Sequence, residues 1–253
     1  MTYPFTSALV TGASSGIGEA MVTLLGEAGV PTVVVARRRD RLEELADRFS
    51  CLEVLVADLT TSRGRSSVEV RAAEADLVVN NAGFGTSGNF RDLDPKRLSQ
   101  EIALNVDALT RISHAALKAM VPRGRGYLLN TSSVASFQSA PRLAVYAATK
   151  AYVTSLTESL HEEVRGSGVH VTALCPGLTR TEFQSVSNTE EYATQYPGFV
   201  WTTAEEVAAA GLRDVAAGKC LSVPGMIYKG LVGVTGVTPR GLARRISGLV
   251  LRK

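Results

Sequence analysis

Residues 11–18 read Thr11-Gly12-Ala13-Ser14-Ser15-Gly16-Ile17-Gly18 and separate two different apolar patterns. The run before them, residues 6–11, predicts a short strand, and the residues after them have helical spacing up to Gly29. A strand, a glycine turn and a helix in this order let the backbone approach a pyrophosphate at the helix N-terminus. The stretch therefore predicts an α/β fold that begins with a dinucleotide-binding unit, although such a turn can also be only a turn.

Apolar runs and helical patterns alternate along the rest of the chain. Strands are predicted at 33–36, 52–57, 77–79, 126–131, 169–175 and about 220–223. Helices are predicted at 38–49, 62–74, 95–121, 144–166 and 203–217. This alternation favours a parallel sheet covered by helices on both faces. We therefore predict an α/β fold with a doubly wound parallel sheet, in a single domain of residues 1–253.

Composition and charge limit the functions of this domain. Of the 253 residues, 45% are hydrophobic and 20% charged, and the net charge is +3. A charge this small, without a concentrated basic patch, argues against nucleic acid binding. The three cysteines lie far apart without a Cys-x-x-Cys pair, which is typical of thiols in a reducing compartment. We find no secretory signal and no apolar run of about 18 residues, so we expect a cytoplasmic protein, and we predict no metal site.

The glycine motif also satisfies the Gly-x-Ser-x-Gly pattern of a hydrolase nucleophile elbow. That site needs an acid and then a histidine later in the chain. The histidines are His114, His161 and His170, and none lies in a glycine-flanked loop near the C-terminus. We interpret all three as structural or solvent-facing, and the hydrolase is the weaker interpretation.

Tyr146 and Lys150 form the strongest candidate for catalysis. In the predicted helix 144–166 they lie four residues apart and share one face. An ammonium beside a phenol favours the phenolate, so we expect Lys150 to lower the pKa of Tyr146 towards the range of a general acid or base. Ser133 follows the strand 126–131, which would bring its hydroxyl to the mouth of the sheet. A Tyr-x-x-x-Lys spacing alone also occurs by chance on surface helices.

The end of the second strand bears on the choice of cofactor. Arg37 and Arg38 follow it directly, where an acidic residue would accept hydrogen bonds from a ribose and an arginine accommodates a 2′-phosphate. These residues favour NADP over NAD, although they could also be the solvated start of a helix. Asp58, followed by Leu59, ends the third strand and could bond an adenine amino group or cap a helix.

Three further segments lie near this predicted site. Asn80-Asn81-Ala82-Gly83 has small residues that would let the chain pass close to a cofactor. Asn105 lies inside a long helix, where asparagine is mildly unfavourable, so it either faces water or has a function. Residues 182–201 hold Phe183, Tyr192, Tyr196, Phe199 and Trp201. This density suggests a lid over an apolar substrate, or else ordinary core or subunit packing.

The tail, residues 226–253, ends in a predicted amphipathic helix with Leu242, Ile246 and Leu249 on one face and basic residues mostly elsewhere. Such a helix can lie on an anionic membrane, but more often it packs on its own domain or on a partner subunit.

Together, these motifs resemble the short-chain dehydrogenase/reductase superfamily in its compact single-domain form, over residues 6 to about 225. Thr11 to Gly18 matches the cofactor motif of that family, and Asn80 to Gly83 matches its Asn-Asn-Ala-Gly. Asn105, Ser133, Tyr146 and Lys150 match its catalytic set, in which spacing favours Ser133 over Ser132. The resemblance implies a Rossmann-type sheet of about seven strands, and a homodimer or homotetramer joined through the helices that carry Asn105 and Tyr146.

The resemblance also implies a reaction and a cofactor site. A hydride would pass between NADP(H) and a carbonyl carbon, while Tyr146 donates a proton, Ser133 stabilises the oxygen and Lys150 also holds the nicotinamide ribose. Asn105 would fix a water that links Lys150 to solvent. The expected cofactor-binding residues are Gly12, Ser14, Ser15, Gly16, Ile17, Gly18, Arg37, Arg38, Asp58, Leu59, Asn81, Ala82, Gly83, Tyr146, Lys150, Pro176, Gly177, Thr179 and Thr181.

One position departs from the commonest NADP pattern, because Ser15 stands where many NADP-preferring members have a basic residue. Specificity for NADP(H) over NAD(H) would then depend on Arg37 and Arg38. The aromatic segment favours a bulky apolar ketone or aldehyde, or the corresponding secondary alcohol. The alternatives are a 3-oxoacyl carrier-protein reductase and a dinucleotide-binding sensor without turnover, which usually lacks the tyrosine or the lysine.

Overall fold

The computed structural model describes residues 2–191, 195–238, 241 and 244–245. Within them, seven strands form one parallel sheet in the order β3-β2-β1-β4-β5-β6-β7. The strands are β1 (Ala8–Thr11), β2 (Thr32–Ala36), β3 (Leu52–Val56), β4 (Leu77–Asn80), β5 (Gly126–Thr131), β6 (Val169–Leu174) and β7 (Leu221–Ser222). The predicted α/β fold with a doubly wound parallel sheet is confirmed.

The central strands are buried on both faces. Leu9 and Val10 are neighbours in β1 and both fully buried, but they belong to different hydrophobic clusters. Val10 lies opposite Val34 of β2 and Val79 of β4, and these three valines share one cluster. Successive side chains of a strand point to opposite faces, so a strand covered on both sides must be apolar throughout. This is why the strands appear in the sequence as continuous apolar runs.

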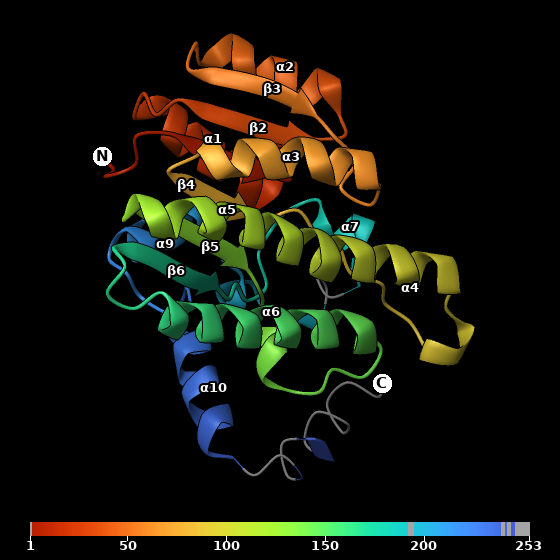
Figure 1. Ribbon diagram of the computed structural model, residues 1–253. Coiled ribbons are helices and arrows are strands. Elements are labelled where there is room, and N and C mark those ends of the chain that lie inside the picture. The colour runs from red at the N-terminus through yellow and green to blue at the C-terminus, as the bar shows by residue number, and fades with distance from the viewer. Residues whose placement is uncertain (1, 192–194, 239–240, 242–243, 246–253) are drawn as a thin grey trace.

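Helices cover the two faces in separate layers (Figure 1). The cluster on one face includes buried residues of α1, α2 and α9, and the cluster on the other includes residues of α3, α5 and α6. These helices are α1 (Gly16–Glu27), α2 (Arg39–Arg48), α3 (Ser62–Glu74), α5 (Leu109–Arg123), α6 (Ala144–Glu163) and α9 (Ala204–Ala216). The chain therefore winds to both sides of the sheet, and the loops after the strands meet at one edge.

The predicted helix 95–121 is present but not uniform. Asp94 caps α4 (Pro95–Ile102) by accepting a hydrogen bond from the backbone N–H of Lys96. A π-helical turn, η2 (Ala103–Ala108), then joins α4 to α5 without a break. The run ends at Gly124, which has φ of +70°, a left-handed conformation that glycine adopts without steric cost.

Candidate active site

The glycine motif lies where β1 ends, between β2 and β4, the strands that flank it in the sheet. The Thr11 hydroxyl donates a hydrogen bond to Val79 O and accepts bonds from the backbone N–H groups of Asn81 and Ala82. The Asn81 amide in turn donates to the carbonyl oxygens of Thr11 and Gly12. These bonds hold the loops after β1 and β4 side by side at the point where the chain turns to opposite sides of the sheet, which is where α/β sheets bind ligands.

The glycines of the motif are required by their contacts. Gly12 and Gly16 have φ of +68° and +58°, a region that L side chains rarely adopt. A Cβ at Gly18 would lie 2.2 Å from the carbonyl oxygen of Gly12. Ser15, the residue before α1, makes no side-chain hydrogen bond to the first turn of the helix. The N–H groups at this helix end are therefore left for another acceptor, which fits a pyrophosphate.

Ser133, Tyr146 and Lys150 come together at the carboxyl ends of β5 and β6. Tyr146 and Lys150 lie on α6, and the Lys150 ammonium is 5.8 Å from the centre of the Tyr146 ring. Lys150 Nζ donates a 2.7 Å hydrogen bond to Thr131 O, the last residue of β5. Ser133 Oγ accepts a hydrogen bond from the N–H of Ala135 in the short helix η3 (Val134–Phe137). This leaves the proton of Ser133 for donation, and the Ser133 hydroxyl hydrogen-bonds to the phenol of Tyr146.

Burial shifts the pKa values of Tyr146 and Lys150 in opposite directions. Burial raises the pKa of Tyr146 to about 12, and a hydrogen bond from Ser133 offsets part of this rise. Burial also lowers the pKa of Lys150 to about 8. The expectation of a lowered pKa for Tyr146 is wrong for this structure, because burial of the phenol is the largest cause of the shift and it raises the pKa. At neutral pH, Tyr146 therefore holds its proton.

Ser132 and Ser133 have different environments. The Ser132 hydroxyl is 2% exposed, donates to the carbonyl oxygen of Lys150 and pairs with Thr154 Oγ1. It therefore fastens α6 to the end of β5. Ser133, in contrast, hydrogen-bonds to the phenol of Tyr146.

Asn105 lies inside the π turn and is only 1% exposed. Its Nδ2 donates to Phe84 O and Thr149 Oγ1, and its Oδ1 accepts from the N–H of Phe84. A Cβ at Gly83 would lie 2.9 Å from Asn105 Oδ1 and 3.5 Å from Lys150 Nζ. The side chain of Asn105 therefore does not face the bulk solvent. It joins the loop after β4 to α6, and a π turn inside an α-helix is often associated with a functional site.

The residues at the ends of β2 and β3 form two separate contacts. The guanidinium of Arg38 bonds to Ser14 and to Glu182. Asp58 Oδ1 accepts two hydrogen bonds from Thr60, and Thr61, rather than Asp58, caps α3. Burial alone would raise the pKa of Asp58, but the bonds from Thr60 and the charge of Arg37 lower it. The carboxylate therefore stays ionised beside Arg37.

The segment after β6 continues the site. The Thr179 hydroxyl donates to Gly177 O and pairs with Thr202 Oγ1, whereas Thr181 packs against Gly16 of the glycine motif. Of these two threonines, Thr181 therefore has the side chain closer to the glycine motif, and the Thr179 hydroxyl is used within its own loop.

The aromatic segment is divided between the site and the surface. Phe183, the first residue of α7 (Phe183–Val186), lies 5.4 Å from the Tyr146 ring, centre to centre. Trp201 Nε1 bonds to Tyr196 O, while Phe199 is 76% exposed. Tyr192 lies outside the described residues. Phe183 thus contacts a predicted catalytic residue directly.

Sequence reasoning missed Tyr228 and Glu101. Tyr228, in α10 (Met226–Val237), donates a hydrogen bond to Val200 O and accepts one from the N–H of Leu178. A Cβ at Gly177 would lie 2.1 Å from its ring, so Tyr228 packs flat on the loop after β6. Glu101 is fully buried one turn before Asn105, and burial raises its pKa. Its position on the inward face of the helix was the only signal in the sequence.

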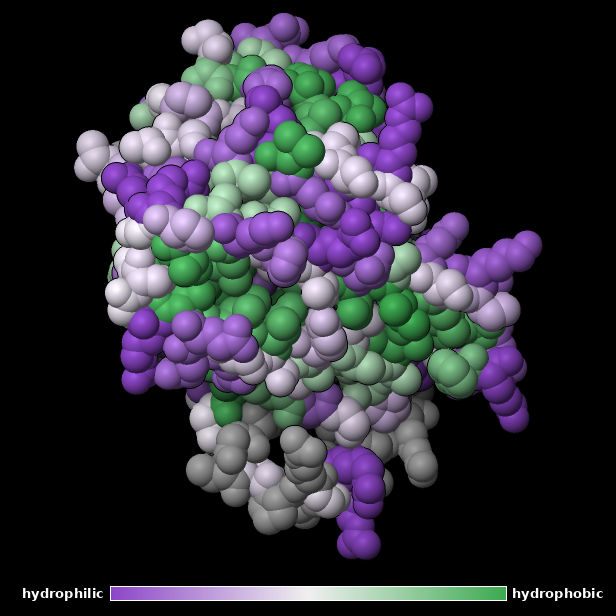
Figure 2. All heavy atoms as spheres, viewed as in Figure 1, coloured by the Kyte–Doolittle hydropathy of each residue, from purple (hydrophilic) through white to green (hydrophobic). Residues whose placement is uncertain are grey.

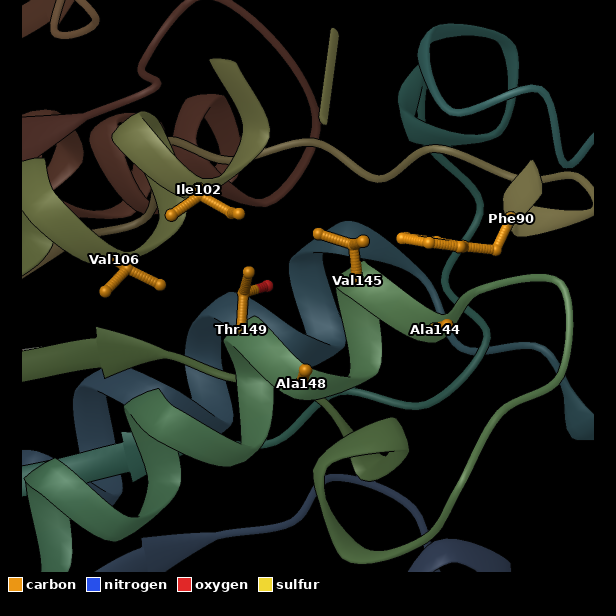
Figure 3. A pocket seen from close by; sticks show the side chains of 7 residues that line it. All are labelled: Phe90, Ile102, Val106, Ala144, Val145, Ala148 and Thr149. Atoms are coloured by element: carbon orange, nitrogen blue, oxygen red, sulfur yellow. The ribbon is translucent and has the colours of Figure 1, made fainter. Parts of the chain in front are cut away.

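An apolar groove lies on the outer face of α6. Figure 2 shows hydrophobic side chains gathered between α4 and α6. Ile102 and Val106 face Val145 and Thr149 across a hollow of about 390 Å³, and Phe90 lies at one end (Figure 3). Phe90 is 64% and Ile102 48% exposed. The groove is formed by the same two helices that carry Asn105 and Tyr146.

The remaining predictions concern the histidines, the tail helix and a membrane span. His161 bonds to Val171 O and His170 stacks on Tyr127, which agrees with structural roles. The predicted tail helix with Leu242, Ile246 and Leu249 lies outside the described residues. No helix in the described part of the chain is both long and apolar enough to cross a membrane.

Comparisons with known proteins agree with this geometry. Residues 6–192 match the family model for short chain dehydrogenases. An uncharacterised oxidoreductase of Myxococcus xanthus is 36% identical over 193 residues, 73% of this chain and 76% of that protein. A short-chain dehydrogenase of Sphingobium yanoikuyae in complex with NADPH has a TM-score of 0.83 and 31% identity, covering 91% of this chain and 93% of that one. A bulky-bulky ketone specific alcohol dehydrogenase of Comamonas testosteroni has a TM-score of 0.76 and 28% identity, covering 93% and 95%.

Proposed function

Because this chain belongs to the short-chain dehydrogenase family and is an oxidoreductase, we propose that it uses NADP(H) to reduce a bulky apolar ketone or aldehyde, or to oxidise the corresponding secondary alcohol. The observation that carries this proposal is the convergence of Ser133, Tyr146 and Lys150 at the carboxyl edge of the sheet, beside an uncapped helix N-terminus. In the reducing direction, NADPH supplies the hydride that the carbonyl carbon accepts.

Tyr146 is the proposed proton donor. Since its pKa is raised to about 12, the phenol is protonated at neutral pH and can donate a proton to the carbonyl oxygen as negative charge develops there. Ser133 Oγ accepts a bond from the N–H of Ala135, so the serine hydroxyl keeps its own proton for donation. Ser133 is proposed to donate this proton in a hydrogen bond to the same carbonyl oxygen. Reduction requires no prior ionisation of Tyr146, which supports it as the usual direction.

Lys150 and Asn105 are proposed to resupply the proton. The ammonium of Lys150, held by Thr131 O, would also bind the nicotinamide ribose. With a pKa of about 8, Lys150 can release and regain a proton near physiological pH. Asn105 is proposed to hold a water that links Lys150 to solvent. This water would lie next to Gly83, whose backbone passes close to the side chains of Asn105 and Lys150.

The NADP(H) preference rests on Arg37 and Arg38. Arg38 already bonds to Ser14 of the glycine motif, so it is positioned to pair with a 2′-phosphate. The NADPH complex of the similar Sphingobium protein supports this choice. The remaining cofactor contacts are proposed as the sequence predicts them. Thr181 is favoured over Thr179 for the nicotinamide carboxamide because the Thr179 hydroxyl donates its proton to Gly177 O, whereas the Thr181 hydroxyl accepts a bond from the N–H of Phe183 and keeps its proton for donation.

A bulky apolar substrate is favoured by Phe183, whose ring packs beside Tyr146. Residues 182–201 would cover the substrate as a lid within the single domain 1–253. The similar Comamonas enzyme is specific for bulky-bulky ketones, which supports this class. A steroid-like, fatty or polyketide-type ketone fits the proposal.

The apolar groove on α6 is proposed to bind a second copy of the chain. Its exposed residues are Ile102 of α4 and Phe90 of a separate short helix, η1 (Phe90–Asp92), and both lie beside the helix α6 that carries Tyr146 (Figure 3). A homodimer or homotetramer would cover this face, and sedimentation velocity would detect it.

The experiment that tests the function is a cofactor titration with turnover. Purified protein is mixed with NADPH or NADH and a panel of apolar ketones and aldehydes, and reduced-nicotinamide absorbance is followed. We expect turnover that prefers NADPH and falls by about 10²-fold to 10⁴-fold in Tyr146→Phe. Tight NADPH binding without turnover of any panel member would favour a sensor, and turnover of only acyl carrier-protein substrates would favour the reductase alternative.

A further inference from the structure

Arg38, the residue just before α2, and Glu182 of the proposed lid form an ion pair. Arg38 NH1 is 2.8 Å from Glu182 Oε2. The same guanidinium donates from Nε to Ser14 Oγ at 3.2 Å and from NH2 to Ser14 O at 3.0 Å. All three nitrogens of Arg38 are thus engaged, two by the glycine motif and one by the residue just before α7.

Glu182 is ionised in this arrangement. The hydrogen bond from Arg38 lowers the pKa of Glu182, and Ser15 lowers it further. A carboxylate is therefore held over the glycine motif, between the guanidinium and a serine of the phosphate-binding turn. An arriving 2′-phosphate would meet this negative charge, and both would compete for the same nitrogen of Arg38.

We propose that Glu182 is a specificity-determining residue that occupies the 2′-phosphate position on Arg38 until the cofactor displaces it. This inference rests on the proposed NADP(H) dependence. NAD(H) has no group that would take the place of the carboxylate, so it leaves the ion pair in place. Glu182 therefore limits the preference of Arg38 for a ligand that brings its own phosphate, because only that ligand has to displace the carboxylate.

The ion pair also connects cofactor recognition to the proposed lid. Glu182 directly precedes α7, whose first residue, Phe183, packs against Tyr146. Displacement of Glu182 breaks its bond to Arg38, which connects this segment to Ser14 of the glycine motif. The 2′-phosphate would thereby loosen the cover over Tyr146 before a carbonyl substrate enters.

The expected size of the effect follows from exposure. The Arg38 and Glu182 side chains are 42% and 47% exposed, and exposed ion pairs are weak, which corresponds to a change of about twofold to fivefold in affinity. Glu182→Gln should therefore bind NADPH about twofold to fivefold more tightly, while its affinity for NADH changes less. The ratio of NADPH affinity to NADH affinity, compared between Glu182→Gln and the wild-type protein, therefore tests the proposal.

The binding test uses isothermal titration of the full chain with NADPH and with NADH. Glu43→Gln is the matched control, because it removes an exposed carboxylate from another arginine pair, Arg39–Glu43, that does not touch the glycine motif. An unchanged NADPH/NADH affinity ratio in Glu182→Gln would overturn the inference. If the wild-type protein binds neither cofactor or prefers NADH, the proposed function fails instead.

A second measurement tests the link to α7. Hydrogen exchange of residues 183–187 is followed with adenosine 2′,5′-bisphosphate and with 5′-AMP, which lacks the 2′-phosphate. We expect faster exchange only with the bisphosphate in the wild-type protein, and fast exchange without any ligand in Glu182→Gln. An equal response of the wild-type protein to both nucleotides would contradict the link.

Discussion

Replacement of the proposed active-site lysine should stabilise the protein. Lys150 is 4% exposed, and burial lowers its pKa from 10.5 to about 8. Each pKa unit corresponds to about 1.4 kcal/mol, so a charged Lys150 in the folded protein costs about 3 kcal/mol at pH 7. Methionine has a similar volume and no charge, but it loses the bond to Thr131 O, which contributes about 1 kcal/mol. Lys150→Met should therefore raise the free energy of unfolding by about 2 kcal/mol at pH 7.

The stability that Lys150→Met gains over the wild-type protein should disappear at high pH. Between the folded pKa of about 8 and the unfolded value of 10.5, the unfolded chain binds more protons at Lys150, so the stability of the wild-type protein rises with pH. At pH 10 the remaining cost of Lys150 is about 1 kcal/mol, similar to the bond that methionine loses, and the two proteins should be about equally stable.

Urea denaturation of both proteins at pH 7 and at pH 10, without cofactor, measures this difference. The raised pKa of Tyr146 makes the folded protein less stable as pH rises above about 10, which is opposite to the effect of Lys150. Tyr146 is present in both proteins, so the difference between their free energies of unfolding reports on Lys150 alone. A variant that is less stable than the wild type at pH 7, or a difference that does not change with pH, would refute the reasoning.

Three further predictions concern other parts of the chain. Glu101→Gln should be more stable than the wild type at pH 7, because burial raises the pKa of Glu101 and the folded protein loses stability as pH rises above about 4.5; equal pH dependence of the two unfolding curves would contradict this. Tyr228→Phe leaves Val200 O and Leu178 N without their bonds, so it should lose about 1–3 kcal/mol and raise the KM for cofactor; unchanged stability and KM would contradict a role in holding the loop. If the basic tail binds membranes, the protein should sediment with anionic vesicles at low salt, and deletion of residues 238–253 should abolish this; no binding of the full chain would exclude a membrane role.

Much of the fold could be predicted from the sequence because its signals are local. Continuous apolar runs such as the one around Val10 require burial on both faces, and the glycine motif fixes the first crossover. The structure makes β7 only two residues long and shortens the ends of several other strands. Strand ends depend on how far a neighbouring strand reaches, which a single sequence does not show.

The placement of Tyr146 and Lys150 near the end of β5 could be predicted from the sequence, whereas the electrostatics of this candidate site could not. The spacing of Tyr146 and Lys150 places them on one face of α6, as expected. The direction of the Tyr146 pKa shift was predicted wrongly, because it depends on burial by distant segments, including Phe183. The Arg38–Glu182 pair joins positions 144 residues apart in the chain, and no local pattern signals such a contact.

The π turn at Asn105 is equivalent to one additional residue inserted into an otherwise regular helix. Without that residue, Pro95 to Arg123 could form an uninterrupted α-helix in which the residues on either side keep their rotational positions. The core contacts of Ile112 and Ala116 with the sheet would survive, whereas Asn105 would no longer be aligned with Phe84 and Thr149. A deletion at this position is therefore expected to separate folding from catalysis, giving a well-packed protein that has lost its bridge between the loop after β4 and α6.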